Sequence, residues 1–132
     1  MSKTSDSFKT YYKFNKYNQN DPIIFIHGVG LNHTIWDQQI NYFKKYNTII
    51  YDLIGHGKTP LDKEKITMKD FSKQLLKLAD SLNIKKFHLV GFSLGSLIAQ
   101  DFASLHGDRL NSLILFGTAY KRTEDEKRQI VN

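Results

Sequence analysis

Ser93 is the residue whose surroundings point most clearly to chemistry, because Gly91 stands two positions before it and Gly95 two positions after it. An apolar run at residues 87–90 precedes this G-x-S-x-G pattern, and apolar residues at helical spacing follow it over residues 97–103. That order is typical of a strand, a sharp turn and a helix. Flanking glycines let a serine at such a turn avoid collisions with the strand and the helix. The pattern therefore predicts a nucleophilic Ser93 at a helix N-terminus, with a positive or otherwise strained φ.

A second turn rich in glycine follows a short apolar segment and reads His27-Gly28-Val29-Gly30. Acyl transfer by a serine needs two backbone N–H donors where the oxyanion develops, and losing one costs about 2.7–4 kcal/mol of barrier. The residue after the nucleophile, Leu94, is expected to supply one donor. Val29 is expected to supply the other, because its flanking glycines let the backbone approach a substrate closely.

A third motif, Asp-Leu-Ile-Gly-His-Gly-Lys-Thr at residues 52–59, follows an expected strand at residues 47–51. In this order the three motifs resemble those of the α/β-hydrolase superfamily, where they follow the third, fourth and fifth strands. The resemblance runs from about residue 21 to about residue 118 and is greatest to the esterase, enol-lactonase and haloperoxidase-like group. It implies a serine hydrolase acting on a small ester or lactone, with His27 as a structural residue of the oxyanion loop. Asp52 is expected to brace loops by accepting backbone N–H bonds.

The same resemblance implies an acid and a histidine after the nucleophile, in that order. After Ser93 the sequence has one histidine, His106, and a helix rising 1.5 Å per residue would place it roughly 15–20 Å away. The acids Asp101 and Asp108 share that helix or its exit, and residues 124–126 are acidic but lie in a polar tail. The chain therefore resembles the N-terminal half of a hydrolase, and the missing C-terminal half of the same fold is the partner that this implies.

Several alternatives stay open. His27 or His56 could substitute as the base, or the chain could be a catalytically silent fragment or a non-catalytic binding module. A more remote alternative is a dinucleotide-binding module, because residues 28–33 nearly match G-x-G-x-x-G and Asp52 follows at the distance of a ribose-binding acid. That alternative has His33 where the third glycine belongs, and it leaves the pattern around Ser93 unexplained.

Composition limits the classes of partner. The 132 residues are 40% hydrophobic and 24% charged, as in ordinary globular domains, and contain no cysteine. We expect a cytoplasmic protein without a membrane partner, because the start of the chain lacks a signal-peptide pattern and no apolar run approaches about 20 residues. The net charge of +6 comes from dispersed lysines, which favours solvated surfaces over nucleic-acid binding. Neither a cofactor nor a metal ion is expected.

The remaining pattern alternates strands and helices, which predicts a mostly parallel α/β sheet with helices on both faces. We expect a single partial domain over residues 1–132, truncated after about its sixth strand. Residues 8–14 predict an edge strand or hairpin arm, residues 33–46 a helix, and Thr67 the start of another helix with a capping box. Residues 113–116 predict a strand covered on both faces, which as the last strand would present an unpaired edge.

Overall fold

The computed structural model describes residues 2–61 and 63–117. The acidic residues 124–126 and the end of the α/β-hydrolase resemblance lie outside the described residues. Six strands form one sheet in the order β1-β2-β4-β3-β5-β6. The described elements are β1 Ser2–Lys3, β2 Tyr11–Asn15, β3 Ile23–Ile26, a 3₁₀ turn His33–Trp36, α1 Asp37–Tyr42, β4 Thr48–Tyr51, α2 Met68–Ser81, β5 Phe87–Phe92, α3 Leu94–His106, a 3₁₀ turn Gly107–Arg109 and β6 Leu110–Phe116.

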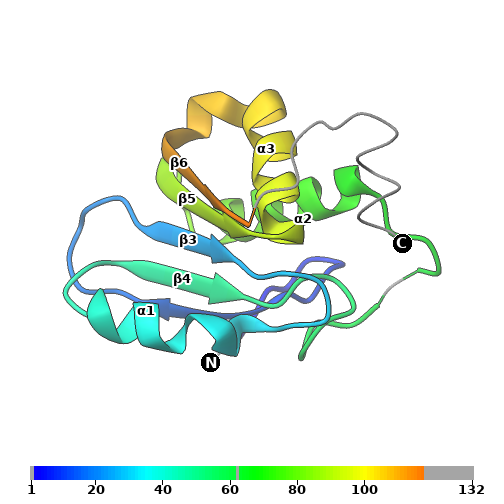
Figure 1. Ribbon diagram of the computed structural model, residues 1–132, viewed down its shortest axis with the longest axis horizontal. Coiled ribbons are helices and arrows are strands. Elements are labelled where there is room, and N and C mark those ends of the chain that lie inside the picture. The colour runs from blue at the N-terminus through cyan, green and yellow to red at the C-terminus, as the bar shows by residue number, and fades with distance from the viewer. Residues whose placement is uncertain (1, 62, 118–132) are drawn as a thin grey trace.

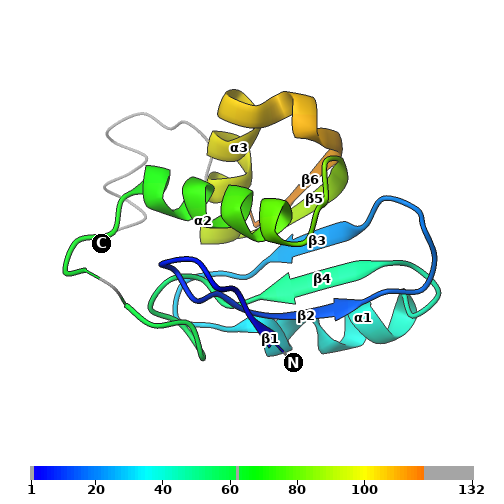
Figure 2. The same ribbon diagram turned by 180° about the vertical axis from the view of Figure 1, so that it is seen from behind.

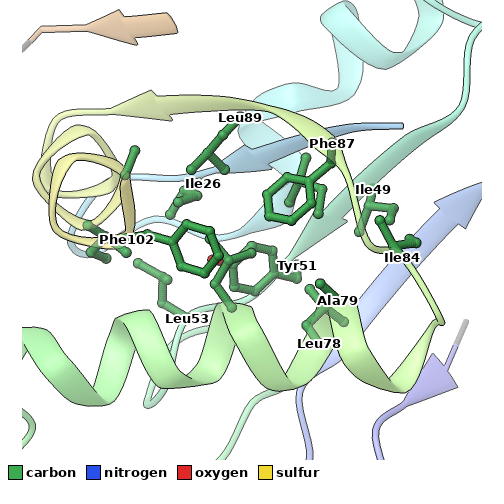
Figure 3. Close-up of a cluster of buried hydrophobic side chains, with 14 residues drawn as sticks. Ile26, Ile49, Tyr51, Leu53, Leu78, Ala79, Ile84, Phe87, Leu89 and Phe102 are labelled. Carbon is green, nitrogen blue, oxygen red and sulfur yellow. The ribbon is translucent and has the colours of Figure 1, made fainter. Parts of the chain in front are cut away.

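Strands β3 to β6 are parallel to one another, whereas β2 pairs antiparallel with β4, and β1 antiparallel with β2. The prediction of a mostly parallel sheet is therefore confirmed. Helices α2 and α3 lie on one face and α1 on the other (Figures 1 and 2). Two apolar clusters fill the two interfaces, and the larger one lies between the sheet and α2 and α3 (Figure 3). Its most deeply buried large side chains include Tyr51, Phe87 and Phe102.

The start of α2 has the predicted capping box. Thr67 Oγ1 accepts the backbone N–H of Asp70, and the Asp70 carboxylate accepts the backbone N–H of Thr67 at 2.8 Å. These contacts satisfy donors that a helix leaves free at its N-terminus. The helix expected over residues 33–46 is shorter, because a 3₁₀ turn takes its first four residues and α1 ends at Tyr42.

Strand β6 departs from the expectation that both of its faces are covered. It lies at an edge of the sheet and pairs with β5, and Leu113, Ile114 and Phe116 are 38%, 48% and 46% exposed. Ile114 and Phe116 face the α1 side, where within the described residues α1 packs over β3 and β4 and does not extend across β6. Leu113 lies on the opposite face, the side of α2 and α3, beside its partner Leu89. The expected unpaired edge is present in this part of the chain.

An apolar groove of about 590 Å³ lies on the α1 face beside β6. Its floor includes Phe25, Val90, Ile114 and Phe116, and Phe43 lines it beyond the end of α1. Among the described residues, none of the helices has the length and apolar character needed to cross a membrane.

Candidate active site

Ser93 occupies the turn between β5 and α3, as predicted. Its backbone has φ 57° and ψ −117°, so the predicted positive φ is confirmed. A non-glycine residue in this region carries strain that the surrounding structure must hold in place. The Ser93 N–H donates to the Phe116 carbonyl at 3.1 Å, and its own carbonyl accepts the Ser96 N–H at 2.9 Å. The side chain is half-buried at the N-terminus of α3.

Gly91 and Gly95 are required by close packing of backbone on backbone. A Cβ on Gly91 would overlap the carbonyl group of Gly95 and lie 2.8 Å from the Ser96 Cα. A Cβ on Gly95 would overlap the Ile26 carbonyl and lie 2.7 Å from the His27 oxygen. Because the obstructing atoms are backbone, no side-chain rotation can relieve either collision. The glycine at position 95 thus lets α3 start directly against the end of β3.

The turn at residues 27–30 lies beside Ser93. Strands β3 and β5 are parallel neighbours with Ile26 opposite Gly91, so the segments that follow them begin at the same carboxyl end of the strands. A Cβ placed on Gly28 would lie 3.2 Å from the Ser93 Cβ. Gly30 has φ +74°, and Val29 is 68% exposed. The predicted proximity of the two motifs is confirmed, and the direction of the Val29 and Leu94 amides stays a prediction.

His27 is fully buried and both of its ring nitrogens have partners. Nε2 accepts the backbone N–H of Leu53 at 3.0 Å, and Nδ1 lies 2.7 Å from the Gly28 carbonyl, to which it donates. Burial lowers the pKa of His27 below its ordinary value, which the hydrogen bond to Gly28 partly offsets. A neutral ring with this fixed tautomer is a structural element, in agreement with the role that the resemblance implied.

Asp52, at this carboxyl end of the strands, accepts several hydrogen bonds from other segments of the chain. Its Oδ1 accepts both the backbone N–H and the Nδ1–H of His33 at 2.8 Å, and its Oδ2 accepts the Lys58 N–H at 2.9 Å. Its carbonyl accepts the side chains of Thr59 and Gln74 at 2.8 and 3.0 Å. The expectation that Asp52 braces loops is confirmed.

These contacts also weaken the dinucleotide alternative, because the Asp52 side chain is fully buried and its carboxylate already faces three N–H donors. A ribose-binding acid has to be accessible to ribose hydroxyls.

Two residues that hold Asp52 and its neighbours in place, His33 and Gln74, were not predicted from the sequence. His33 was noted only as the residue in place of a third glycine, and Gln74 lies on the apolar face of α2. Gln74 is fully buried, accepts the Ile54 N–H at 3.2 Å and donates to Thr10 at 3.1 Å. A glutamine interrupting the apolar face of an amphipathic helix was the available signal, because a buried amide needs partners.

No histidine within the described ranges hydrogen-bonds Ser93 Oγ. His56 donates from Nδ1 to the Ile54 carbonyl at 3.0 Å, and its ring centroid lies 5.1 Å from that of His27. His106 ends α3 and its ring lies 5.1 Å from that of Phe102. The described residues also bring together no group of three histidine, aspartate or glutamate side chains suited to a metal ion.

Comparison with known proteins gives consistent similarities. The family model described as alpha/beta hydrolase fold matches residues 21–131. The chain is 33% identical over 110 residues to 3-oxoadipate enol-lactonase 1 of Acinetobacter baylyi, covering 81% of this chain and 41% of that protein. It is 39% identical over 101 residues to the pimeloyl-[acyl-carrier protein] methyl ester esterase of Legionella pneumophila, covering 75% of this chain and 38% of that protein.

Among solved structures, a carboxylesterase of the thaumarchaeon Nitrososphaera gargenis superposes with a TM-score of 0.86 at 30% identity. That match covers 99% of this chain and 49% of the other chain. The enol-lactonase from Burkholderia xenovorans LB400 superposes with a TM-score of 0.78 at 23% identity, covering 82% of this chain and 43% of the other, and supports the fold. The chain spans half or less of the length of these relatives.

Proposed function

The chain belongs to the α/β-hydrolase fold family, and from that premise we propose that it carries the acyl-accepting half of a serine hydrolase. Ser93 is the proposed nucleophile, and the Val29 and Leu94 amides are the proposed oxyanion donors. The observation that carries the proposal is the strained Ser93 turn packed directly against the glycine turn that follows β3. A plain helix N-cap serine requires neither the positive φ nor backbone-packed glycines on both sides.

The proposed chemistry is acyl transfer. The Ser93 oxygen forms a bond to the carbonyl carbon of an ester or lactone, and the carbonyl electrons move to the oxygen that the two amides stabilise. Collapse of this intermediate breaks the bond to the alcohol oxygen, which leaves with the proton from the Ser93 hydroxyl. Water then attacks the acyl-serine and releases the carboxylic acid. No cofactor takes part in these steps.

Small esters and lactones are the proposed substrates. The relatives include an enol-lactonase and a methyl ester esterase by name, and both names describe cleavage of a carbonyl–oxygen bond.

The relay that activates the serine is proposed to come from outside the described residues. The relatives are more than twice the aligned length, and here no described histidine nitrogen reaches Ser93 Oγ. We therefore propose that a C-terminal half of the fold, the part that the relatives have and this chain does not span, supplies the acid and the histidine. Without them the Ser93 hydroxyl stays protonated, and only about 10³–10⁴-fold acceleration over water is expected from binding and the oxyanion donors.

The test is acetyl transfer from p-nitrophenyl acetate, followed by peptide mass spectrometry. We expect acetyl groups to accumulate on Ser93, because deacylation also lacks a base, and Ser93→Ala to remove that modified peptide. Ser104, exposed on the same helix, is the internal control and should acetylate much more slowly. Equal acetylation of Ser93 and Ser104 would support the silent binding module and contradict the proposal.

The proposed origin of the relay is tested separately. Expressing a longer product of the source reading frame past Asn132, where one exists, is expected to give turnover that Ser93→Ala abolishes. Strong turnover by the 132-residue chain that is lost in His56→Ala or His27→Ala would assign the base to one of those histidines and overturn the proposed relay.

A further inference from the structure

Two buried histidines bracket the exposed turn that carries Val29. His27 precedes the turn and His33 follows it, with exposed fractions of 0% and 8%. His27 accepts the Leu53 N–H, and His33 donates twice to the Asp52 carboxylate. Both ends of the turn are therefore tied to two consecutive residues at the end of β4. We refer to His27, His33, Asp52 and Leu53 as the histidine clamp.

Asp52 is a rigid anchor for this clamp. Its carbonyl is held by Thr59 and Gln74, and its own N–H donates to the Tyr11 carbonyl at 3.0 Å. Gly57 packs so closely that a Cβ there would overlap the Asp52 carboxylate. Because these contacts hold Asp52 in place, they also restrict the positions of the residues that hydrogen-bond to it.

The orientation of the Val29 N–H follows from the Gly28 carbonyl, because the two groups belong to one planar peptide unit. The Gly28 carbonyl accepts from His27 Nδ1 at 2.7 Å and from the Leu31 N–H at 3.2 Å. Val29 itself is exposed, and Gly30 adopts a positive φ. The Val29 N–H is therefore oriented by His27 at one end of the turn and by Leu31, two residues before His33, at the other.

We propose that His33 is a positioning residue for the Val29 amide, acting through its paired hydrogen bonds to Asp52. The inference rests on the function proposed above, because it assigns a purpose to the clamp only where that amide faces an oxyanion. It requires the ring Nδ1–H of His33 as well as the backbone N–H, since a side chain without a donor would leave the Asp52 carboxylate short of a partner. Removing one of the three N–H donors to this buried carboxylate weakens the hold of Asp52 on the end of the turn.

The test compares His33→Leu with His33→Asn in the full chain. Leucine fills similar space without a donor, whereas asparagine places an amide N–H close to the position of the histidine Nδ1. The acetylation rate of Ser93 is expected to fall about tenfold or more in His33→Leu, in line with the effect of misplaced groups on catalysis, and to stay within about threefold of wild type in His33→Asn. Acetylation of surface lysines in the same samples is the internal reference.

Ser72→Ala is the matched control, because it removes the hydrogen bond that the buried Ser72 hydroxyl on α2 donates to Asp101 on α3 at 2.6 Å, a contact that involves no residue of the clamp. It should destabilise the protein without changing the Ser93 rate. Hydrogen exchange at the Val29 and Leu31 amides gives a readout independent of chemistry, and it is expected to be about tenfold faster in His33→Leu, as for a turn released from its anchor. Should His33→Leu not fold, Asp52→Asn is the second variant. Its Ser93 acetylation rate is expected to lie between that of wild type and the rate expected for His33→Leu.

The outcomes separate the two proposals. Absence of Ser93 acetylation in the wild type, together with fast exchange at Val29 in His33→Leu, would overturn the proposed function and leave the clamp in place. Wild-type acetylation and exchange rates in His33→Leu, or in Asp52→Asn if the leucine variant does not fold, would overturn the positioning role. A slowing in His33→Leu no larger than that in Ser72→Ala would do the same, because it would be a general effect of lower stability.

Discussion

Two regions meet at Ser93, and they are built in opposite ways. On the β3–β4 side, the histidine clamp and Gln74 are buried and almost every polar group is paired. On the β6 side, Leu113, Ile114 and Phe116 are substantially exposed, and Ile114 and Phe116 line an apolar groove. Ser93 joins the two regions, because its Cβ lies close to Gly28 and its backbone N–H donates to the Phe116 carbonyl. The side that carries the proposed oxyanion donors is thus supported from within the described chain, whereas the β6 side has apolar surface that the described chain leaves uncovered.

The two edges of the sheet show the same contrast. The seven residues of β6 contain no charged side chain, whereas β1 and β2 at the other edge contain Lys3 and Lys13. Charged side chains on an edge strand discourage pairing with other chains. Within the described residues, the β6 edge lacks this protection.

A large effect on stability is expected from a substitution that forces the start of α3 away from the end of β3. Gly95→Ala is expected to lower the free energy of unfolding by roughly 3 kcal/mol, because its Cβ would overlap backbone carbonyls at the end of β3. Gly107→Ala is the control, since a Cβ there meets nothing within 4 Å and φ is −59°. It should be neutral or stabilising by about 0.4–1 kcal/mol. Urea unfolding measures both, and equal stabilities for the two variants would contradict the packing described for Gly95.

Two paired leucines on β5 and β6 allow the contribution of a core position to stability to be compared with that of a position on the β6 edge. Leu89 on β5 and Leu113 on β6 are direct partners, but they are 0% and 38% exposed. Leu89→Ala is expected to cost about 2–5 kcal/mol of unfolding free energy, as for other buried leucines. Leu113→Ala should cost about 1 kcal/mol or less, since much of its surface already faces water. Chemical denaturation of both variants checks the difference, and a Leu113→Ala cost matching that of Leu89→Ala would show that β6 is covered in solution.

The clamp also predicts a dependence of stability on pH. Burial lowers the pKa of His27 in the folded state below 6.5, so the unfolded chain binds more protons there as the pH falls. The contribution of His27 is therefore complete above the unfolded pKa and declines as the pH drops below about 6.5. The stability difference between wild type and His27→Gln, measured by urea unfolding from pH 8 to pH 5, should shrink below that point. A difference that stays constant over the range would argue against a neutral, buried His27.

The smallest effect is expected far from both regions, at the capping box of α2. The Thr67 hydrogen bonds, helped by Lys63, lower the pKa of Asp70 to about 2. The stabilisation is present above the unfolded value of 3.8 and is lost as the pH falls toward about 2. The Tm difference between wild type and Asp70→Asn should therefore disappear over that range. Lys63→Met should leave most of the difference in place; a complete loss in this variant would assign the effect to the ion pair.

Local sequence patterns predicted the features that depend on neighbours in the chain. The Thr67 capping box and the contact of Gly91 with Gly95 have their partners within a few residues, so spacing alone was informative. His33 was missed because its partner, Asp52, lies nineteen residues away and is brought near by the pairing of β3 with β4. The wrong expectation for β6 has a related cause, since apolar composition predicts a need for cover and does not supply the helix that provides it. The roles of Ser93, Val29 and Leu94 and the extent of the domain remain predictions.

The position of Trp36 gives the molecule a spectroscopic reporter. It is the single tryptophan of the chain, it is 4% exposed, and its ring lies 5.0 Å from that of Phe25 and 6.5 Å from that of Phe116. Its indole N–H has no hydrogen-bond partner among the residues that the structure describes. Its fluorescence therefore originates next to the apolar groove, on the boundary between the buried core and β6. A polypeptide or small molecule that binds in the groove beside Phe116 is expected to change the emission of this one residue, so occupancy of the groove can be followed in solution without attaching a label.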